Sequence, residues 1–139
     1  MFKISTKGDY GLLLLSALAR SWGKSEFLSL KEIAEKEKLP LAYLSQIISE
    51  LKGAGLVTSK EGRDGGYQLS RAPGEITLIK ALEILEGPIS PVKCCKSEEE
   101  KKSSKGCACE ATCTVKPVWK EAQEHLTKYL EKKTLADTI

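Results

Sequence analysis

Apolar side chains recur at helical spacing in five segments of this chain. The second segment begins at Ser29-Leu30-Lys31-Glu32, a capping box in which the Ser hydroxyl and the Glu carboxylate each accept a backbone hydrogen bond. Leu39-Pro40 separates the second segment from the third. Ser5 or Thr6 is expected to cap the first segment, and Thr77 the fourth. The predicted helices cover residues 6–22, 30–37, 40–52, 78–86 and 114–133.

Two short β-prone runs lie between the third and fourth helices, at residues 56–59 and 67–70. The glycine-rich stretch between them, 60–66, is typical of a turn, so we expect a β-hairpin. Two short helices followed by a hairpin form a winged helix-turn-helix. The predicted fold is therefore mainly α with a small β-hairpin wing, and residues 135–139 are expected to be a short tail.

The chain is expected to have two parts. Residues 1–75 form a winged helix-turn-helix DNA-binding domain, whereas residues 76–139 contain a linker helix, a cysteine-rich sensor loop (88–113) and a long dimerisation helix (114–133). The apolar side of this last helix predicts that it packs against a second copy of the chain in a homodimer. The side chains expected at that interface are Val118, Leu126 and Leu130, with Trp119 and Tyr129 nearby.

The exposed side of the third helix carries side chains that can reach base edges in the major groove of DNA. These candidates are Tyr43, Ser45, Gln46 and Ser49. Lys60 and Arg63 place positive charge on the wing, where it can meet phosphate or a narrow minor groove. Pairs of short helices are common in helical domains, and winged helices also bind proteins. Here, however, four features follow one another along the chain: the capping box, the proline break, the apolar stripe and the hairpin. This order favours a double-stranded DNA operator as the partner.

The location of the basic residues agrees with this expectation. The net charge is only +3, but residues 1–72 contain 11 basic and 8 acidic side chains, whereas residues 73–139 contain 11 of each. The whole excess therefore lies in the half that is predicted to meet a polyanion. Chance unevenness is the alternative explanation.

The number and the positions of the cysteine and histidine residues exclude several classes of protein. All five cysteines fall between Cys94 and Cys113, which fits a local thiol site in a reducing cytoplasm better than a secreted domain. Such a cluster can bind iron–sulfur units or zinc, or can act as a disulfide redox sensor. No CxxC pair is present and His125 is the only histidine, so we expect no enzyme. A thiol enzyme or a metal-delivery protein is the remote alternative.

The apolar run Gly11–Ala19 looks like a short signal peptide, but Asp9 interrupts its entry and Arg20 follows it directly. It is also too short to span a membrane. We therefore expect a cytoplasmic protein with no membrane partner.

Several motifs together resemble one family of bacterial winged-helix transcription regulators, which includes IscR, NsrR and CymR. They are Ser5–Leu12, Leu30–Ala34, Leu41–Gln46, the glycine-rich wing up to Tyr67, Glu86–Ile89 and Thr134–Asp137. The resemblance covers nearly the whole chain. It implies a homodimeric regulator, most simply a repressor, that senses iron–sulfur, redox or nitric-oxide status.

For the thiol loop, the resemblance implies an iron–sulfur cluster, 2Fe-2S or 4Fe-4S, held by three cysteines. Cys107 and Cys113 match the spacing of the second and third cysteines of cluster-binding members. Cys94 is then the first, and Cys95 is its close competitor. The gap between Cys94 and Cys107 is longer than is usual in the family.

The fourth ligand differs among these regulators. IscR-like members use a histidine three residues after the last cysteine, where this chain has Lys116. NsrR-like members use an aspartate of the first helix that the partner subunit contributes, and Asp9 stands at that position. Cys109 is the other candidate. A cluster-free thiol or disulfide regulator, or a zinc-dependent one, is the alternative within the same fold.

The DNA-reading positions depart from the family's pattern. Ser45 stands where relatives often carry Glu, and Glu61 stands where they often carry Arg. The DNA sequence that a known relative prefers is therefore not transferred to this chain.

Overall fold

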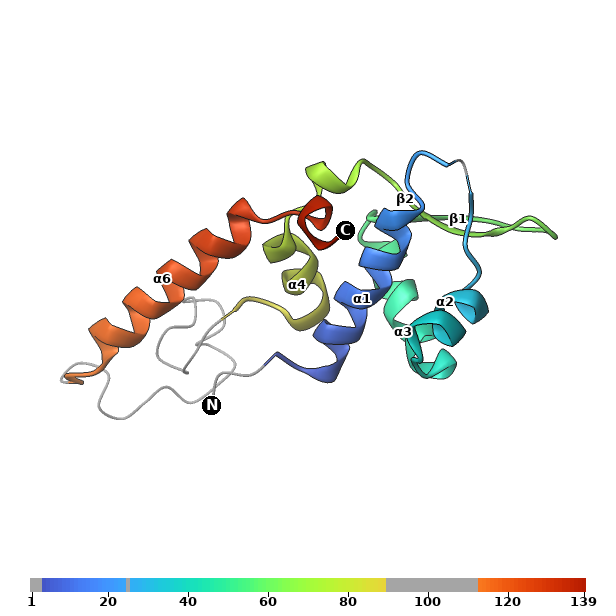
Figure 1. Ribbon diagram of the computed structural model, residues 1–139. Coiled ribbons are helices and arrows are strands. Elements are labelled where there is room, and N and C mark those ends of the chain that lie inside the picture. Colours follow the sequence, from blue (N-terminus) through green and yellow to red (C-terminus); the bar gives the residue numbers. More distant parts are fainter. Residues whose placement is uncertain (1–3, 25, 90–112) are drawn as a thin grey trace.

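The computed structural model describes residues 4–24, 26–89 and 113–139 of the chain (Figure 1). The elements are α1 (Thr6–Arg20), α2 (Leu30–Glu37), α3 (Leu41–Gly53), β1 (Val57–Lys60), β2 (Gly66–Leu69), the 3-10 helix η1 (Pro73–Glu75), α4 (Leu78–Glu86), α6 (Lys116–Lys132) and the 3-10 helix η3 (Leu135–Thr138). The predicted fold class, mainly helical with one antiparallel hairpin, is confirmed. Within the described residues, no helix has the length and apolar content that a membrane span requires.

The helices begin where the sequence predicts caps. In the capping box of α2, the Ser29 amide donates to the Glu32 carboxylate and the Glu32 amide donates to the Ser29 hydroxyl, both at 3.1 Å. Ser5, rather than Thr6, caps α1, and Thr77 caps α4. Pro40 was predicted as the first helical residue of α3 but is its N-cap, because its backbone is extended rather than helical.

The core lies around α1, which runs between α4 on one side and α2 and α3 on the other (Figure 1). Three leucines of α1 are fully buried, and they meet the apolar stripe of α3 and the inner residues of the hairpin. Burial of these side chains fixes the inner face of α3 and leaves its opposite face outside. The stripe residues of α3 are Leu44, Ile47, Ile48 and Leu51.

Two glycines allow α1 and α4 to approach closely. A Cβ atom on Gly11 would lie 2.2 Å from Cδ1 of Leu85, and one on Gly8 would lie 2.4 Å from Oε1 of Glu86. A side chain at either site would therefore require the side chain of Leu85 or Glu86 to shift. The same Glu86 carboxylate accepts hydrogen bonds from the amide and the hydroxyl of Ser5, so the last turn of α4 also holds the start of α1.

Helix α6 extends away from the other helices (Figure 1), and none of its residues is buried. Leu126 and Leu130 were predicted to face a second copy, but they pack within the chain, against a small cluster on α4 and the segment after it. The sequence could not show this because the periodicity of a helix does not identify which partner covers its apolar face. Val118, Trp119 and Tyr129 are exposed.

The last residues were expected to be a tail, and this prediction is wrong. They form η3, in which the side chain of Leu135 is fully buried in the main core. The Leu135 amide donates to the carbonyl of Ile76 at 3.0 Å, and the Leu78 amide donates to the carbonyl of Lys133 at 2.9 Å. These contacts attach the end of the chain to the start of α4.

Candidate nucleic-acid interface and thiol segment

The outer face of α3 presents a small set of polar side chains. Ser45, Gln46 and Ser49 are exposed, as predicted. The Ser45 hydroxyl donates to the carbonyl of Leu41 at 3.0 Å, so it is already paired within its own helix. Gln46 and Ser49 are therefore the side chains of this set best able to offer hydrogen bonds to a ligand.

Tyr43 differs from the expectation that it lies on the exposed face. It is half-buried at the edge of the core and meets the ring of Tyr10 edge-to-face, with the ring centroids 5.7 Å apart and an interplanar angle of 82°. This contact joins the first turns of α1 and α3 and supplies packing as well as orientation. Only the outer part of Tyr43 remains available to a partner.

A long-range ion pair also holds α3 in place. The Nζ atom of Lys7 lies 2.7 Å from Oε2 of Glu50, so α1 neutralises the carboxylate that follows Ser49 on the outer face. An unpaired carboxylate there would repel a phosphate backbone. Sequence reasoning missed this pair because nothing local connects residues so far apart along the chain.

The wing is attached to the segment before α2. The strands pair from Val57–Leu69 to Lys60–Gly66, and Tyr67 exchanges two further backbone hydrogen bonds with Leu28, at 3.0 and 2.7 Å. Gly66 has φ +150°, and a Cβ atom on it would lie 2.5 Å from the carbonyl carbon of Leu28. The glycine thus permits the close approach that fixes the wing beside the helix-turn-helix. No local pattern in the sequence predicts this pairing.

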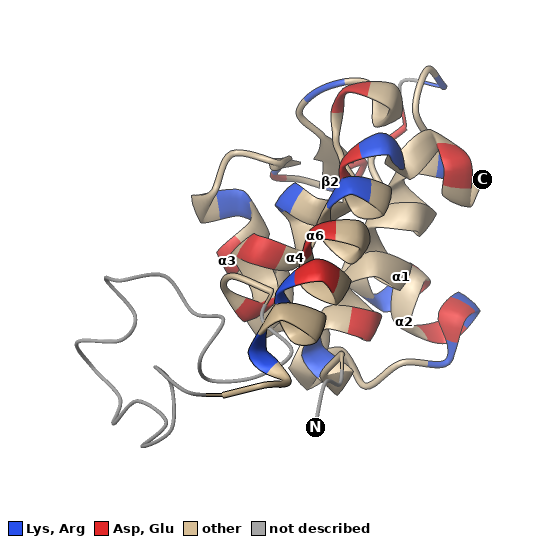
Figure 2. Cartoon of the chain, turned by 90° about the vertical axis from the view of Figure 1, so that its left-hand side faces the viewer, with Lys and Arg blue, Asp and Glu red and all other residues tan. Residues whose placement is uncertain are grey.

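Charge at the wing is mixed. Lys60 and Arg63 are both exposed, as predicted, and the Nζ atom of Lys60 lies 5.7 Å from the ring centroid of Phe27. Together they line an open hollow of about 330 Å³ with Glu26, Phe27, Glu32, Asp64 and Gly65. Nearby carboxylates therefore offset part of the positive charge. Figure 2 views the chain from the other side, with α6 toward the viewer, and there too basic and acidic positions are interspersed on the helices that the structure describes.

Most of the candidate metal ligands lie outside the described residues. These are Cys94, Cys95, Cys107 and Cys109. Cys113 is half-buried just ahead of α6, and Asp9 is exposed in the first turn of α1, where it lines an open hollow of about 490 Å³. The start of α1, the helix that carries Asp9, and the start of α6, which Cys113 precedes, lie well apart (Figure 1). In the described part of the chain, no group of three or more potential metal ligands is present.

The donor chemistry is nevertheless compatible with a metal centre. Thiolates with one carboxylate suit iron–sulfur units or zinc. Cys113 and Asp9 both retain access to solvent, so neither donor is already enclosed in the core. A site that uses both would have to draw them from two copies of the chain.

Residues 4–139 match the family model Rrf2, whose description is an iron-dependent transcriptional regulator. The transcriptional regulator CymR of Bacillus subtilis is 38% identical over 135 residues, which cover 97% of this chain and 88% of that protein. Its solved structure, titled as that of the global cysteine regulator of B. subtilis, has a TM-score of 0.79 and covers 99% of this chain and 95% of that one.

Two further solved structures are similar. IscR of T. potens has a TM-score of 0.76 at 36% identity, covering 97% of this chain and 84% of that one. The oxidized form of Staphylococcus aureus CymR has a TM-score of 0.71 at 34% identity, covering 96% and 92%. The fold, including the hairpin beside α3, is thus one that transcription regulators use.

Proposed function

Because the chain belongs to the Rrf2 family of transcriptional regulators, we propose that it acts as a homodimeric repressor and binds a DNA operator with α3 and the wing. The observation that carries this proposal is the outer face of α3. Gln46 and Ser49 project from a helix whose opposite side is fixed in the core, which is the arrangement that major-groove readout requires.

The exposed apolar residues of α6 support the homodimer. Val118 is 60% exposed, and Trp119 and Tyr129 are 42% and 58% exposed, although all three are large apolar side chains. A row of such residues on a helix that projects from the molecule favours an interface. Two copies joined along α6 would present two α3 helices to half-sites roughly 34 Å apart, or one turn of B-DNA.

The DNA proposal is tested by selecting duplexes from a random library with the full chain and measuring binding across salt concentrations. Replacing Arg63 by Ala should weaken binding to all sequences and reduce the slope of log K against log [salt] by about one unit, since one phosphate contact is lost. Arg71→Ala is the control, because it removes the same charge from an exposed residue beyond the hairpin. Failure of the wild-type chain to select any duplex contradicts the proposal.

We further propose that DNA affinity depends on an iron–sulfur cluster held by Cys94, Cys107, Cys113 and Asp9 of the partner subunit. The donor set and the iron-dependent description of the family support it. Such a centre would connect the start of α6 in one copy to the DNA-binding half of the other. Its presence would therefore bias the relative placement of the two α3 helices.

The cluster is tested by anaerobic purification, an absorption spectrum, and iron and sulfide analysis. A brown protein that loses its colour on Asp9→Ala, but keeps it on the control Asp64→Ala, supports Asp9 as the fourth ligand. A spectrum unchanged by Asp9→Ala points to Cys109 instead. A colourless, iron-free protein contradicts the cluster.

A cluster-free thiol regulator is the second candidate, and the similarity to CymR favours it. CymR of B. subtilis is described as a global cysteine regulator, and the structure of S. aureus CymR has been solved in an oxidized form. In that case the purified chain should be colourless, and oxidation followed by reduction should change its DNA affinity reversibly. About one zinc per chain would instead indicate a zinc-dependent regulator.

A further inference from the structure

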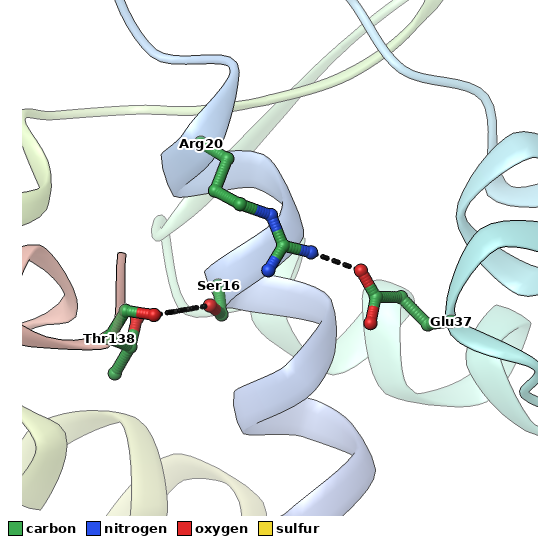
Figure 3. Close-up of polar contacts among 4 residues, drawn as sticks. All are labelled: Ser16, Arg20, Glu37 and Thr138. Atoms are coloured by element: carbon green, nitrogen blue, oxygen red, sulfur yellow. Dashed lines mark hydrogen bonds and ion pairs between the residues drawn. The ribbon is translucent and has the colours of Figure 1, made fainter.

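Two polar side chains of α1, one turn apart, contact different parts of the molecule (Figure 3). Ser16 meets Thr138 of η3, and Arg20 forms an ion pair with Glu37, the last residue of α2. Helix α1 therefore has the end of the chain on one side and the helix-turn-helix on the other.

The Ser16 contact differs from other buried polar contacts. In the described part of the chain, the buried polar side chains are Ser16 and Ser21, which are 7% and 6% exposed. The Ser21 hydroxyl donates to the carbonyl of Leu18, within its own turn, at 2.9 Å. The Ser16 hydroxyl lies 3.1 Å from the Thr138 hydroxyl and 3.4 Å from the Thr138 carbonyl, both in a distant segment.

Each hydroxyl of this pair has one hydrogen and two contacts. The Thr138 hydroxyl can donate to the Ser16 hydroxyl or, at 2.7 Å, to the carbonyl of Leu135. The Ser16 hydroxyl can donate to the Thr138 carbonyl. Loss of the Thr138 hydroxyl would remove one of the two contacts of a buried group and leave it only the longer one, to the carbonyl.

The segment that holds Thr138 is itself fixed. Leu135 is fully buried, and the backbone bonds that join Leu135 to Ile76 and Leu78 to Lys133 attach η3 to the start of α4. As a result, η3, which begins shortly after α6 ends, is held beside α1.

On the other side of α1, the ion pair meets the helix-turn-helix at its turn. Glu37 ends α2, and Lys38 then adopts a left-handed conformation with φ 57° that directs the chain into α3. A constraint on Glu37 therefore acts on the angle between α1 and both helices of the motif. The Glu37 side chain is 18% exposed and the Arg20 side chain 40%, so solvent screens the pair on the arginine side and less on the carboxylate side.

We propose that Ser16 and Thr138 are positioning residues for DNA binding: their contact holds α1 against the C-terminal segment, so that α1, through Arg20 and Glu37, presents α3 at a fixed orientation. The inference rests on the proposed function of α3 as the DNA-reading helix. It adds the last residues of the chain to those that set affinity for an operator.

The experiment uses the full chain and a duplex that the wild type selects from a random library, with an unrelated duplex for comparison at the same salt. Thr138→Val removes the hydroxyl at nearly constant shape, and Thr138→Ser keeps it. Ser16→Ala and the double variant Ser16→Ala/Thr138→Val complete the cycle. Ser21→Ala is the matched control, because its hydroxyl is equally buried but bonds only within its turn.

We expect Thr138→Val and Ser16→Ala each to weaken binding to the selected duplex by about three- to tenfold, the effect of one neutral hydrogen bond. Binding to the unrelated duplex should not change. The double variant should be no worse than either single variant, Thr138→Ser should restore wild-type affinity, and Ser21→Ala should change thermal stability without changing the ratio of the two affinities. Amide exchange in residues 30–37 should rise in Thr138→Val, which a purely local role at the C-terminus would not cause.

Each other result is decisive. If the wild type selects no duplex, this inference and the proposed function both fail. If the wild type selects a duplex and Thr138→Val binds it equally well, or the two single effects add in the double variant, the inference alone is overturned. Faster exchange confined to α1 and η3 would also overturn it, since the contact would then not reach α2.

Discussion

At the scale of the residue, Gln46 is the side chain of α3 most suited to reading a base. Gln46 is exposed and lies one helical turn after Ala42, close to Ser49. Its side-chain amide can donate one hydrogen bond and accept another at the same time. This pair of groups matches the N6 and N7 atoms of adenine in the major groove. Ser45, by contrast, has its hydroxyl bonded to the Leu41 carbonyl.

Replacement of Gln46 by Ala should therefore change sequence preference rather than general affinity for DNA. We expect a loss of about 1–3 kcal/mol at one base pair of each half-site and little change at the others. Competition binding with single-base variants of a selected duplex measures this profile. Ser45→Ala on the same face is the control and should leave the wild-type profile nearly unchanged. Equal weakening at every position would show that Gln46 does not contact a base.

At the scale of the element, the closeness of α1 and α4 depends on Gly11. The Cβ atom of an alanine would overlap the side chain of Leu85, which is only 3% exposed and would have to shift within the core. Gly11→Ala should lower the free energy of unfolding by about 1–3 kcal/mol, as overpacked cores do. Gly53→Ala is the control, because its new Cβ meets nothing within 4 Å and the residue ends a helix. Denaturant unfolding should show this control stabilised by about 0.5–1 kcal/mol; a neutral Gly11→Ala would contradict the close approach.

Helix α6 leads to a prediction about assembly. The substitution Val118→Glu would place a charge in the proposed interface. The cost of burying that charge should raise the dissociation constant of the dimer by about tenfold or more. Light scattering across a range of concentrations measures this shift. Leu13→Glu is the control, since Leu13 is an exposed leucine that belongs to α1 rather than α6. Unchanged dimerisation of Val118→Glu would place the interface elsewhere.

The elements themselves were predictable to the extent that their signals are local. The capping box at Ser29 and the cap at Thr77 define helix starts through residues three apart, and both are present. Contacts between distant segments were not predictable in this way. The pairing of Leu28 with Tyr67 and the packing of Leu126 on α4 depend on which surfaces meet after folding. The exposed set on α3 was correct except for Tyr43, which a ring from another helix covers.

At the scale of the whole molecule, the main core joins segments from both halves of the chain. Leu135, from the last five residues, lies in the same buried cluster as the leucines of α1 and the stripe of α3. The sequence could not place it there, because a short segment between a long helix and the C-terminus has too few residues to show a period. The end of the chain therefore belongs to the same core as α1 and α3, within the part predicted to bind DNA.

This arrangement predicts a large effect from a substitution near the end of the chain. Leu135→Ala removes a fully buried side chain and should lower the free energy of unfolding by about 2–5 kcal/mol, through lost burial and the cavity that remains. Ile139→Ala, four residues later and 65% exposed, should change it by no more than about 0.5 kcal/mol. Denaturant unfolding monitored by the fluorescence of Trp22, beyond the end of α1, in a chain whose other tryptophan is replaced (Trp119→Phe), should report the loss as a shift of the same cooperative transition. A separate, earlier transition in Leu135→Ala would instead mean that η3 detaches on its own, and that the core of α1 and α3 is stable without it.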